Sequence, residues 1–201
     1  MGSRLSVDSP IFRDYNGHAL SHKIVIEKGW SFMDKKVAKL LEEQVNKELY
    51  SAYLYLDFSN FCKHKGLDGF ANWYEVQAKE EMDHAILFVK YLQNNNQAVA
   101  LSAIAKPDVK PKTVMDVLKA GLKHEEYVTS LIHTIYGAAK GVDDFRTTQF
   151  LDWFVKEQGE EEVNANELVS KMELFGSDPR SLYLLDNELK ARAYSAPSLV
   201  L

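Results

Sequence analysis

The chain of 201 residues has little that would let it form disulfides, bind nucleic acid or enter a membrane. Its single cysteine, Cys62, excludes an intrachain disulfide and the zinc and rubredoxin modules that are built on Cys-x-x-Cys pairs. No apolar run approaches the roughly 18 residues of a membrane span, and the N-terminus lacks the apolar segment of a secretory signal. The formal net charge of −5 argues against a basic nucleic-acid-binding face and suits the attraction of cations. We therefore expect a cytoplasmic protein with no nucleic-acid or membrane partner.

Residues 1–32 differ from the rest of the chain. They contain Pro10, Gly17, Gly29 and a short β-prone run at 24–26, and they show no helical period. We predict that they form an N-terminal extension, a fusion or cloning remnant, and that residues 33–201 form the functional domain. The alternative is a native regulatory arm. Mass spectrometry of the protein expressed from its native gene separates the two, because a full-length mass contradicts a remnant.

From residue 34 onward the apolar residues recur at the three-and-four spacing of amphipathic helices. Four long helices are predicted at about 34–64, 67–94, 113–140 and 143–175, with Thr113 as the N-cap of the third. We expect Tyr53 and Leu56 of the first helix and Met82 of the second to face the core. Asp178-Pro179 opens a short fifth helix whose leucines lie on one side.

The segment 96–112 carries Pro107 and Pro111 and has no helical stripe. A connection of this length allows the third helix to begin at the opposite end of a bundle from the end of the second. The predicted fold is therefore all-α: a four-helix bundle with a long crossover between its second and third helices and a short fifth, C-terminal helix.

Each long helix carries potential metal ligands near its middle. They are Glu48, then Glu81 with His84, then Glu125, then Gln158 with Glu161. Positions three apart lie on one face of a helix, so Glu81 and His84 can bind one ion together. A lone glutamate is more often a solvated surface residue, but ligands at matching depths on four helices predict a buried pocket for two ions. Carboxylates with one imidazole suit an oxygen-reactive iron centre.

The two ion positions are expected to be unequal. Di-iron bundles carry Glu-x-x-His twice, whereas this chain has Gln158-x-x-Glu161 in place of the second copy. The stronger position would use Glu48, Glu81 and His84. The weaker one would share Glu81 as a bridge and add Glu125 with Gln158 or Glu161.

An acidic run on the fourth helix points to a further cation. Glu157 and Glu161 are like charges one turn apart, which disfavours a helix, and Gly159 costs about 1 kcal/mol relative to alanine. A solvated acidic face explains Glu162, whereas a cation explains Glu157, Glu160 and Glu161 better. Glu80 could face the same region and complete a third position.

Among the aromatic residues near these ligands, only Tyr55 is assigned a role, because its phenol can donate an electron or a hydrogen bond to an oxidising centre. Tyr127, Trp153 and Cys62 are expected in the core. His64, His124 and His133 have no partner spacing and are assigned no role.

Four segments resemble the ligand segments of the prokaryotic ferritins, in the same order. They are 41–50 (LEEQVNKELY), 80–84 (EEMDH), 123–125 (KHE) and 157–162 (EQGEEE), and the resemblance covers about residues 33–190. It implies a ferritin-like bundle and a shell of 24 subunits that stores a ferric mineral.

The resemblance also implies site residues and cofactors. The ferroxidase centre would comprise Glu48, Glu81, His84, Glu125, Gln158 and Glu161. As in the non-haem bacterial type, a third iron would use Glu80, Glu157, Glu160 and Glu161, with Tyr55 as a redox partner. Bacterioferritins repeat Glu-x-x-His on the last long helix, and because this repeat is absent we expect no haem. Relatives often carry a larger residue at position 159, so the fourth helix is expected to be more flexible there.

The predicted activity is oxidation of Fe²⁺ by O₂ or H₂O₂, followed by storage of Fe³⁺ as mineral. A metal-binding cage without catalysis would need degraded ligands, and a rubrerythrin-like peroxidase would need more cysteines than this chain has. A DNA-protecting mini-ferritin would place its ligands across a subunit interface and lack the fifth helix. A dodecamer in solution would favour that alternative.

Overall fold

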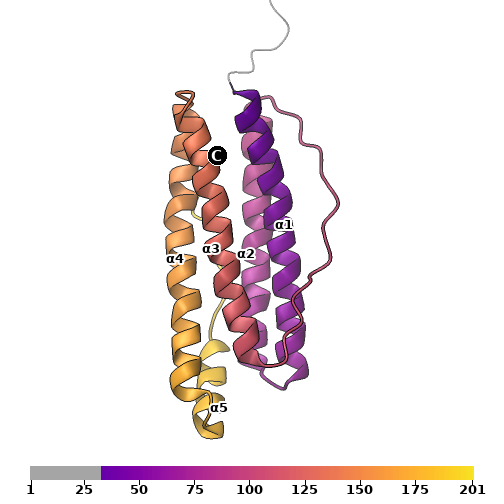
Figure 1. Ribbon diagram of the computed structural model, residues 1–201, viewed down its shortest axis with the longest axis vertical. Coiled ribbons are helices and arrows are strands. Elements are labelled where there is room, and N and C mark those ends of the chain that lie inside the picture. The colour runs from indigo at the N-terminus through magenta and orange to yellow at the C-terminus, as the bar shows by residue number, and fades with distance from the viewer. Residues whose placement is uncertain (1–32) are drawn as a thin grey trace, which may run out of the picture. The chain divides into compact units, whose positions relative to one another are not determined.

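The computed structural model describes residues 33–201, so the predicted N-terminal extension at 1–32 lies outside the described residues. The predicted all-α fold is confirmed: four long helices and a short fifth are present (Figure 1). They are α1 (Lys35–His64), α2 (Asp68–Asn94), α3 (Val114–Lys140), α4 (Phe145–Phe175) and α5 (Pro179–Leu189). None of the helices within residues 33–201 is long and apolar enough to cross a membrane.

Short polar residues fix where most helices begin. Thr113 caps α3 as predicted, and its side chain and that of Asp116 form a reciprocal capping box. Asp34 caps α1 and Asp178 caps α5. The fourth helix begins two residues later than the sequence predicted. Asp143 there adopts a positive φ of 55°, which is not helical, and Asp144 supplies the cap.

The segment between α2 and α3 is the long extended crossover that the sequence predicted. It follows the outer side of α1 (Figure 1), where Asn46 donates hydrogen bonds to the carbonyls of Ser102 (3.3 Å) and Ala103 (3.2 Å). Glu42 accepts a hydrogen bond of 2.6 Å from the amide of Ala100. The crossover therefore returns the chain to the end of the bundle where α2 started, and α3 begins there.

The apolar core consists of two clusters. One contains Val45, Phe88, Ile132 and Phe154 from the four long helices, and the other contains Leu54, Tyr74, Leu118 and Leu168 from the same helices. On each of the four long helices, the predicted ligands lie in the sequence between the residues of one cluster and the residues of the other. A buried polar layer thus separates two apolar clusters, which limits the access of water to it from either end.

Four residues that were expected in the core are exposed instead. Tyr53, Leu56 and Met82 expose 48%, 50% and 44% of their surface, respectively. The helical period places them next to buried positions, but no helix of residues 33–201 covers this face of α1 and α2. Tyr127, also expected in the core, is 44% exposed on α3.

The fifth helix is attached to the first turn of α2. Leu67, which precedes α2, provides no side-chain cap. The buried carboxylate of Asp186 in α5 accepts hydrogen bonds from the amides of Gly69 (2.7 Å) and Phe70 (3.1 Å) instead. A Cβ at position 69 would lie 1.6 Å from the carbonyl oxygen of Asp186. Glycine is therefore required here for close approach of the two backbones.

Candidate metal centre

The predicted ligands from all four long helices are buried in the polar layer. Glu48 comes from α1, Glu81 and His84 from α2, Glu125 from α3, and Gln158 and Glu161 from α4, and their exposed fractions range from 1% to 6%. Burying several carboxyl groups together is costly unless a cation or hydrogen-bond donors compensate. The hydrogen bonds of each carboxyl group show whether donors already compensate its burial.

Glu48, Glu81 and His84 form the first ligand group. Each of them offers one ligand atom, and these atoms lie within 4.8 Å of one another. His84 Nδ1 is 3.3 Å from Glu81 Oε2. Glu48 Oε1 accepts a hydrogen bond of 2.9 Å from Gln44, whereas Glu48 Oε2 is buried and receives none from the residues that the structure describes. An oxygen left in this way is what a cation would satisfy.

Glu125, Gln158 and Glu161 form the second ligand group, in which hydrogen-bond donors already hold the carboxylates. The Tyr55 hydroxyl donates a short hydrogen bond to Glu125 Oε1, and Gln158 Nε2 donates to Glu125 Oε2 at 3.2 Å. Glu161 Oε2 accepts a hydrogen bond of 2.7 Å from Gln77 on α2. A cation at this group must replace or share these donors.

The acid–base properties of the centre follow from burial. Burial, reinforced by the charge of Glu81, raises the pKa of Glu48 to about 8. Burial with the charge of Glu161 raises the pKa of Glu125 to about 8. The pKa of Glu81 lies well above its usual range because of burial and the charges of Glu125 and Glu161. Glu81 therefore interacts with carboxylates of both groups, as a bridging ligand would.

The residues predicted for a third ion are more dispersed. Glu80 forms an ion pair with Arg192 at 2.5 Å, and Glu160 is exposed and pairs with Lys156 at 3.2 Å. Glu157 is half-buried, and burial with the neighbouring Glu161 and Glu160 charges raises its pKa. Gly159 continues the helix with open space where a Cβ would be. The third ion position stays a prediction.

Tyr55 is fully buried, and burial with the Glu125 charge raises its pKa well above the usual range. It is therefore a neutral hydrogen-bond donor. Its ring makes an edge contact with His124 at a centroid distance of 5.8 Å. His124 Nε2 lies 2.8 Å from Ser51 Oγ, and burial lowers the pKa of this histidine to about 4. His124, which had no role in the sequence analysis, is thus a neutral residue beside the centre.

Sequence reasoning missed three further residues at the centre: Gln44, Gln77 and Arg192. Gln44 and Gln77 each precede a predicted ligand glutamate, Glu48 and Glu81, by four residues. They therefore lie on the same helix face as these ligands. That spacing could have identified both glutamines as donors. Nothing local to Arg192 could have identified it, because it lies 112 residues from Glu80 in the sequence.

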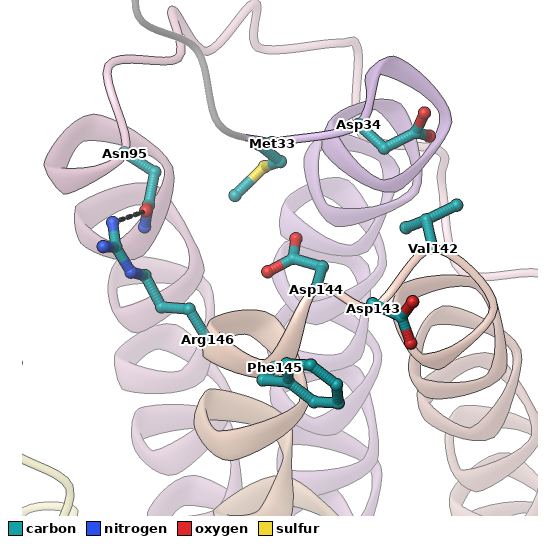
Figure 2. A pocket seen from close by; sticks show the side chains of 8 residues that line it. All are labelled: Met33, Asp34, Asn95, Val142, Asp143, Asp144, Phe145 and Arg146. Atoms are coloured by element: carbon teal, nitrogen blue, oxygen red, sulfur yellow. Dashed lines mark hydrogen bonds between the residues drawn. The ribbon is translucent and has the colours of Figure 1, made fainter.

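A separate pocket lies at the end of the bundle where α1 and α4 begin (Figure 2). Asp34 and Asp144 line it, but both carboxylates are engaged as helix caps. Arg146 donates a hydrogen bond of 3.0 Å to Asn95 across it (Figure 2). None of the predicted ligands lines this pocket, so it is distinct from the metal centre.

Comparison with known proteins identifies the family of this chain. The family model described as ferritin-like domain matches residues 38–175. The bacterial non-heme ferritin of Campylobacter jejuni is 37% identical over 163 residues, which cover 81% of this chain and 98% of that protein. A probable bacterial non-heme ferritin-like protein of Haemophilus influenzae is 34% identical, over 78% of this chain and 95% of that protein.

A solved structure shows the same relationship in three dimensions. The open-pore ferritin of the archaeon Archaeoglobus fulgidus superimposes with a TM-score of 0.78 at 37% identity. The superposition covers 80% of this chain and 99% of that one. Family membership implies iron binding and storage. This chain belongs to the ferritin family, among the prokaryotic non-haem ferritins.

Proposed function

We propose that the protein is a ferroxidase that binds Fe²⁺ at a paired carboxylate site, oxidises it with O₂ or H₂O₂ and passes Fe³⁺ to a mineral inside a shell of 24 subunits. The observation that carries this proposal is the clustering of Glu48, Glu81 and His84, with one carboxylate oxygen lacking a donor among the described residues. Such an oxygen-rich site with one imidazole suits Fe²⁺.

The chain's own residues account for the order of binding. The first Fe²⁺ is held by Glu48, Glu81 and His84, because binding there breaks few existing hydrogen bonds. The second is held between Glu81 and Glu125, with Glu161 or Gln158 completing its ligands. Two Fe²⁺ ions together supply the two electrons that convert O₂ and two protons to H₂O₂.

Proton release accompanies binding. At neutral pH the raised pKa values of Glu48 and Glu125 keep both carboxyls largely protonated in the absence of metal. An incoming Fe²⁺ displaces these protons. Tyr55 and Gln158 donate to the two oxygens of Glu125, so the second ion must replace or share these donors. Weaker binding of the second ion suits a centre that releases Fe³⁺ to the mineral rather than retaining it.

A shell explains the apolar residues left exposed on α1 and α2. Leu56 and Met82 line a groove on this face together with the small residues Ala52, Ala71 and Ala78. Packing of a second copy there would bury them. Native mass spectrometry tests the assembly: a 24-subunit mass supports the proposal, and a dodecamer favours a mini-ferritin-like protein instead.

Stopped-flow absorbance after mixing with Fe²⁺ and O₂ tests the catalytic step. The wild type should show a fast ferric phase, and Glu81→Gln should lose it, because the bridging carboxylate is removed while its volume is kept. Glu126→Gln is the matched control, since Glu126 is the exposed neighbour of a ligand on α3. A slow wild-type reaction, or an unchanged fast phase in Glu81→Gln, would contradict the ferroxidase and favour a non-catalytic cage.

A further inference from the structure

The segment that follows α5 runs back along the bundle, and its end lies far from α5 (Figure 1). The side-chain amide of Asn72 on α2 donates hydrogen bonds to the carbonyls of Leu189 (3.2 Å) and Arg192 (2.9 Å). Further along, Trp153 Nε1 donates to Ser198 Oγ at 3.1 Å, and Leu199 packs against one of the two apolar clusters. Both ends of the segment are therefore attached to the helices that carry the centre.

Arg192 is the point at which this segment reaches the centre. Its Nη2 lies 2.5 Å from Glu80 Oε2, and its Nη1 donates to Gln77 Oε1 at 2.7 Å and to the carbonyl of Trp73 at 3.3 Å. The guanidinium also lies over the Trp73 ring, 4.0 Å from its centroid. The side chains of Arg192 and Glu80 are only 16% and 18% exposed, respectively. This is a specific, largely desolvated ion pair, which is worth more than a surface pair.

The contact continues inward to a predicted ligand. Gln77 accepts from Arg192 through its oxygen and donates through its nitrogen to Glu161 at 2.7 Å. One side-chain amide thus connects the guanidinium to a carboxylate of the second ligand group. The positive charge of Arg192 therefore lies beside Glu80, one of the acidic residues for which the sequence predicted a third ion.

We propose that Arg192 and a divalent cation compete for Glu80, so that an ion binds there only when the guanidinium leaves. The inference rests on the proposed function for the identity of the natural ion, Fe²⁺. The guanidinium occupies Glu80 Oε2, one of the two oxygens through which this carboxylate could bind a metal ion, and its positive charge repels a cation at the other. Departure of the guanidinium from Glu80 would also break its contacts with Gln77 and Trp73.

Equilibrium binding of Mn²⁺ to the full-length protein, without O₂, tests the competition independently of iron oxidation. Arg192→Gln should bind Mn²⁺ beside Glu80 roughly tenfold more tightly than the wild type, because a charge-assisted hydrogen bond no longer has to be broken. Arg180→Gln is the matched control: it removes the same charge from an exposed position on α5 and should leave the affinity unchanged. Arg192→Lys, which keeps the charge but not the two-pronged contact, should fall between the two.

Trp73 provides a second readout. The chain has three tryptophans, so Trp30→Phe with Trp153→Phe leaves Trp73 as the only one. Because Trp153→Phe also removes the hydrogen bond to Ser198, both proteins that are compared carry this background. Mn²⁺ at Glu80 should change Trp73 fluorescence in this background and should change it much less when Arg192→Gln is added. A crystal soaked in Mn²⁺ should show the anomalous signal at Glu80 only where Arg192 has moved.

Equal affinities in Arg192→Gln and Arg180→Gln would overturn the proposal, as would weaker binding in Arg192→Gln. A soaked wild-type crystal with Mn²⁺ on Glu80 and Arg192 unmoved would also overturn it, even if the variants fail to fold. So would the absence of Mn²⁺ at Glu80 from both the wild type and Arg192→Gln. The proposed function fails separately, through the absence of Fe²⁺ oxidation in the wild type.

Discussion

The two ligand groups of the centre are equally buried but are compensated differently. In the first, formed by Glu48, Glu81 and His84, one carboxylate oxygen has no donor among the described residues. In the second, Tyr55 and Gln158 donate to both oxygens of Glu125, and Gln77 donates to Glu161. A cation at the first group would therefore satisfy the Glu48 oxygen to which no described residue donates, whereas a cation at the second would have to replace or share existing donors. Unequal hydrogen bonding alone can order the binding of two ions.

The largest expected effect is on the first ion. Glu48→Gln removes one of the three predicted ligands of the first group and should weaken binding of the first Mn²⁺ roughly 100-fold. Titration calorimetry without O₂ measures this. Glu43→Gln, an exposed acid on the same helix, should bind as the wild type does. If Glu125→Gln weakened the first ion more than Glu48→Gln, the assignment of the groups would be reversed.

The pH dependence is shared by both groups. Their carboxyls Glu48 and Glu125 have pKa values of about 8 in the folded state, against an ordinary value of 4.5. Between these values the folded protein holds protons that the unfolded chain has released, so stability falls as pH rises from about 5 to 8. Thermal unfolding of the metal-free protein at pH 5.5 and 8.5 measures the fall, and Mn²⁺ should reverse it at pH 8.5.

The double variant Glu48→Gln with Glu125→Gln provides the control for this pH effect. Without these two carboxyls the difference in melting temperature between pH 5.5 and 8.5 should shrink, and Glu81, whose pKa is also raised by burial, contributes what remains. A difference as large as in the wild type would show that Glu48 and Glu125 do not carry the raised pKa values.

Tyr55→Phe tests the second group by removing one of its donors. The Glu125 carboxylate then has one hydrogen bond fewer to lose, and the affinity for the second Mn²⁺ should rise about fivefold at pH 9, where proton competition is small. Tyr136→Phe is the control, because the Tyr136 hydroxyl donates to the exposed Asp152 at 3.0 Å. A fall in affinity would instead mean that the phenol holds Glu125 in its ligand position.

The smallest effect is expected at Gly159, which follows Gln158 in α4. A Cβ there would meet no atom within 4 Å, so Gly159→Ala should stabilise the helix by roughly 0.5–1 kcal/mol and raise the melting temperature by about 2–4 °C. Gly137→Ala on α3 has the same open space and should stabilise equally. A change in second-ion affinity in Gly159→Ala alone would show that the second group depends on flexibility of α4.

The sequence predicted the fold well because its signals are local. Thr113 begins α3 as expected, since a cap and its helix are adjacent in the chain. The burial of the predicted ligands follows from helical period and depth alone. Tyr53 and Met82 were misplaced because a period shows an apolar face but not whether a neighbour in the same chain covers it.

The hydrogen bonds that distinguish the two ligand groups could not be predicted from the sequence. Tyr55 and Glu125 are 70 residues apart, and Arg192 and Glu80 are 112 apart. Such pairs depend on the rotation of each helix about its axis and on the path of the C-terminal segment. No spacing rule relates residues at these separations, so the difference between the groups emerges only from the folded chain.

The attachment of α5 through Asp186 and Gly69 has a consequence for how the protein can vary. Alanine is ordinarily the mildest replacement for a helical glycine, yet a methyl group at position 69 would overlap the Asp186 backbone. It would push α5 outward, uncover Leu185 and Leu189 and leave the first amides of α2 without an acceptor. The absence of a side chain at position 69 thus allows α5 to cap the start of α2, the helix that carries Glu81 and His84.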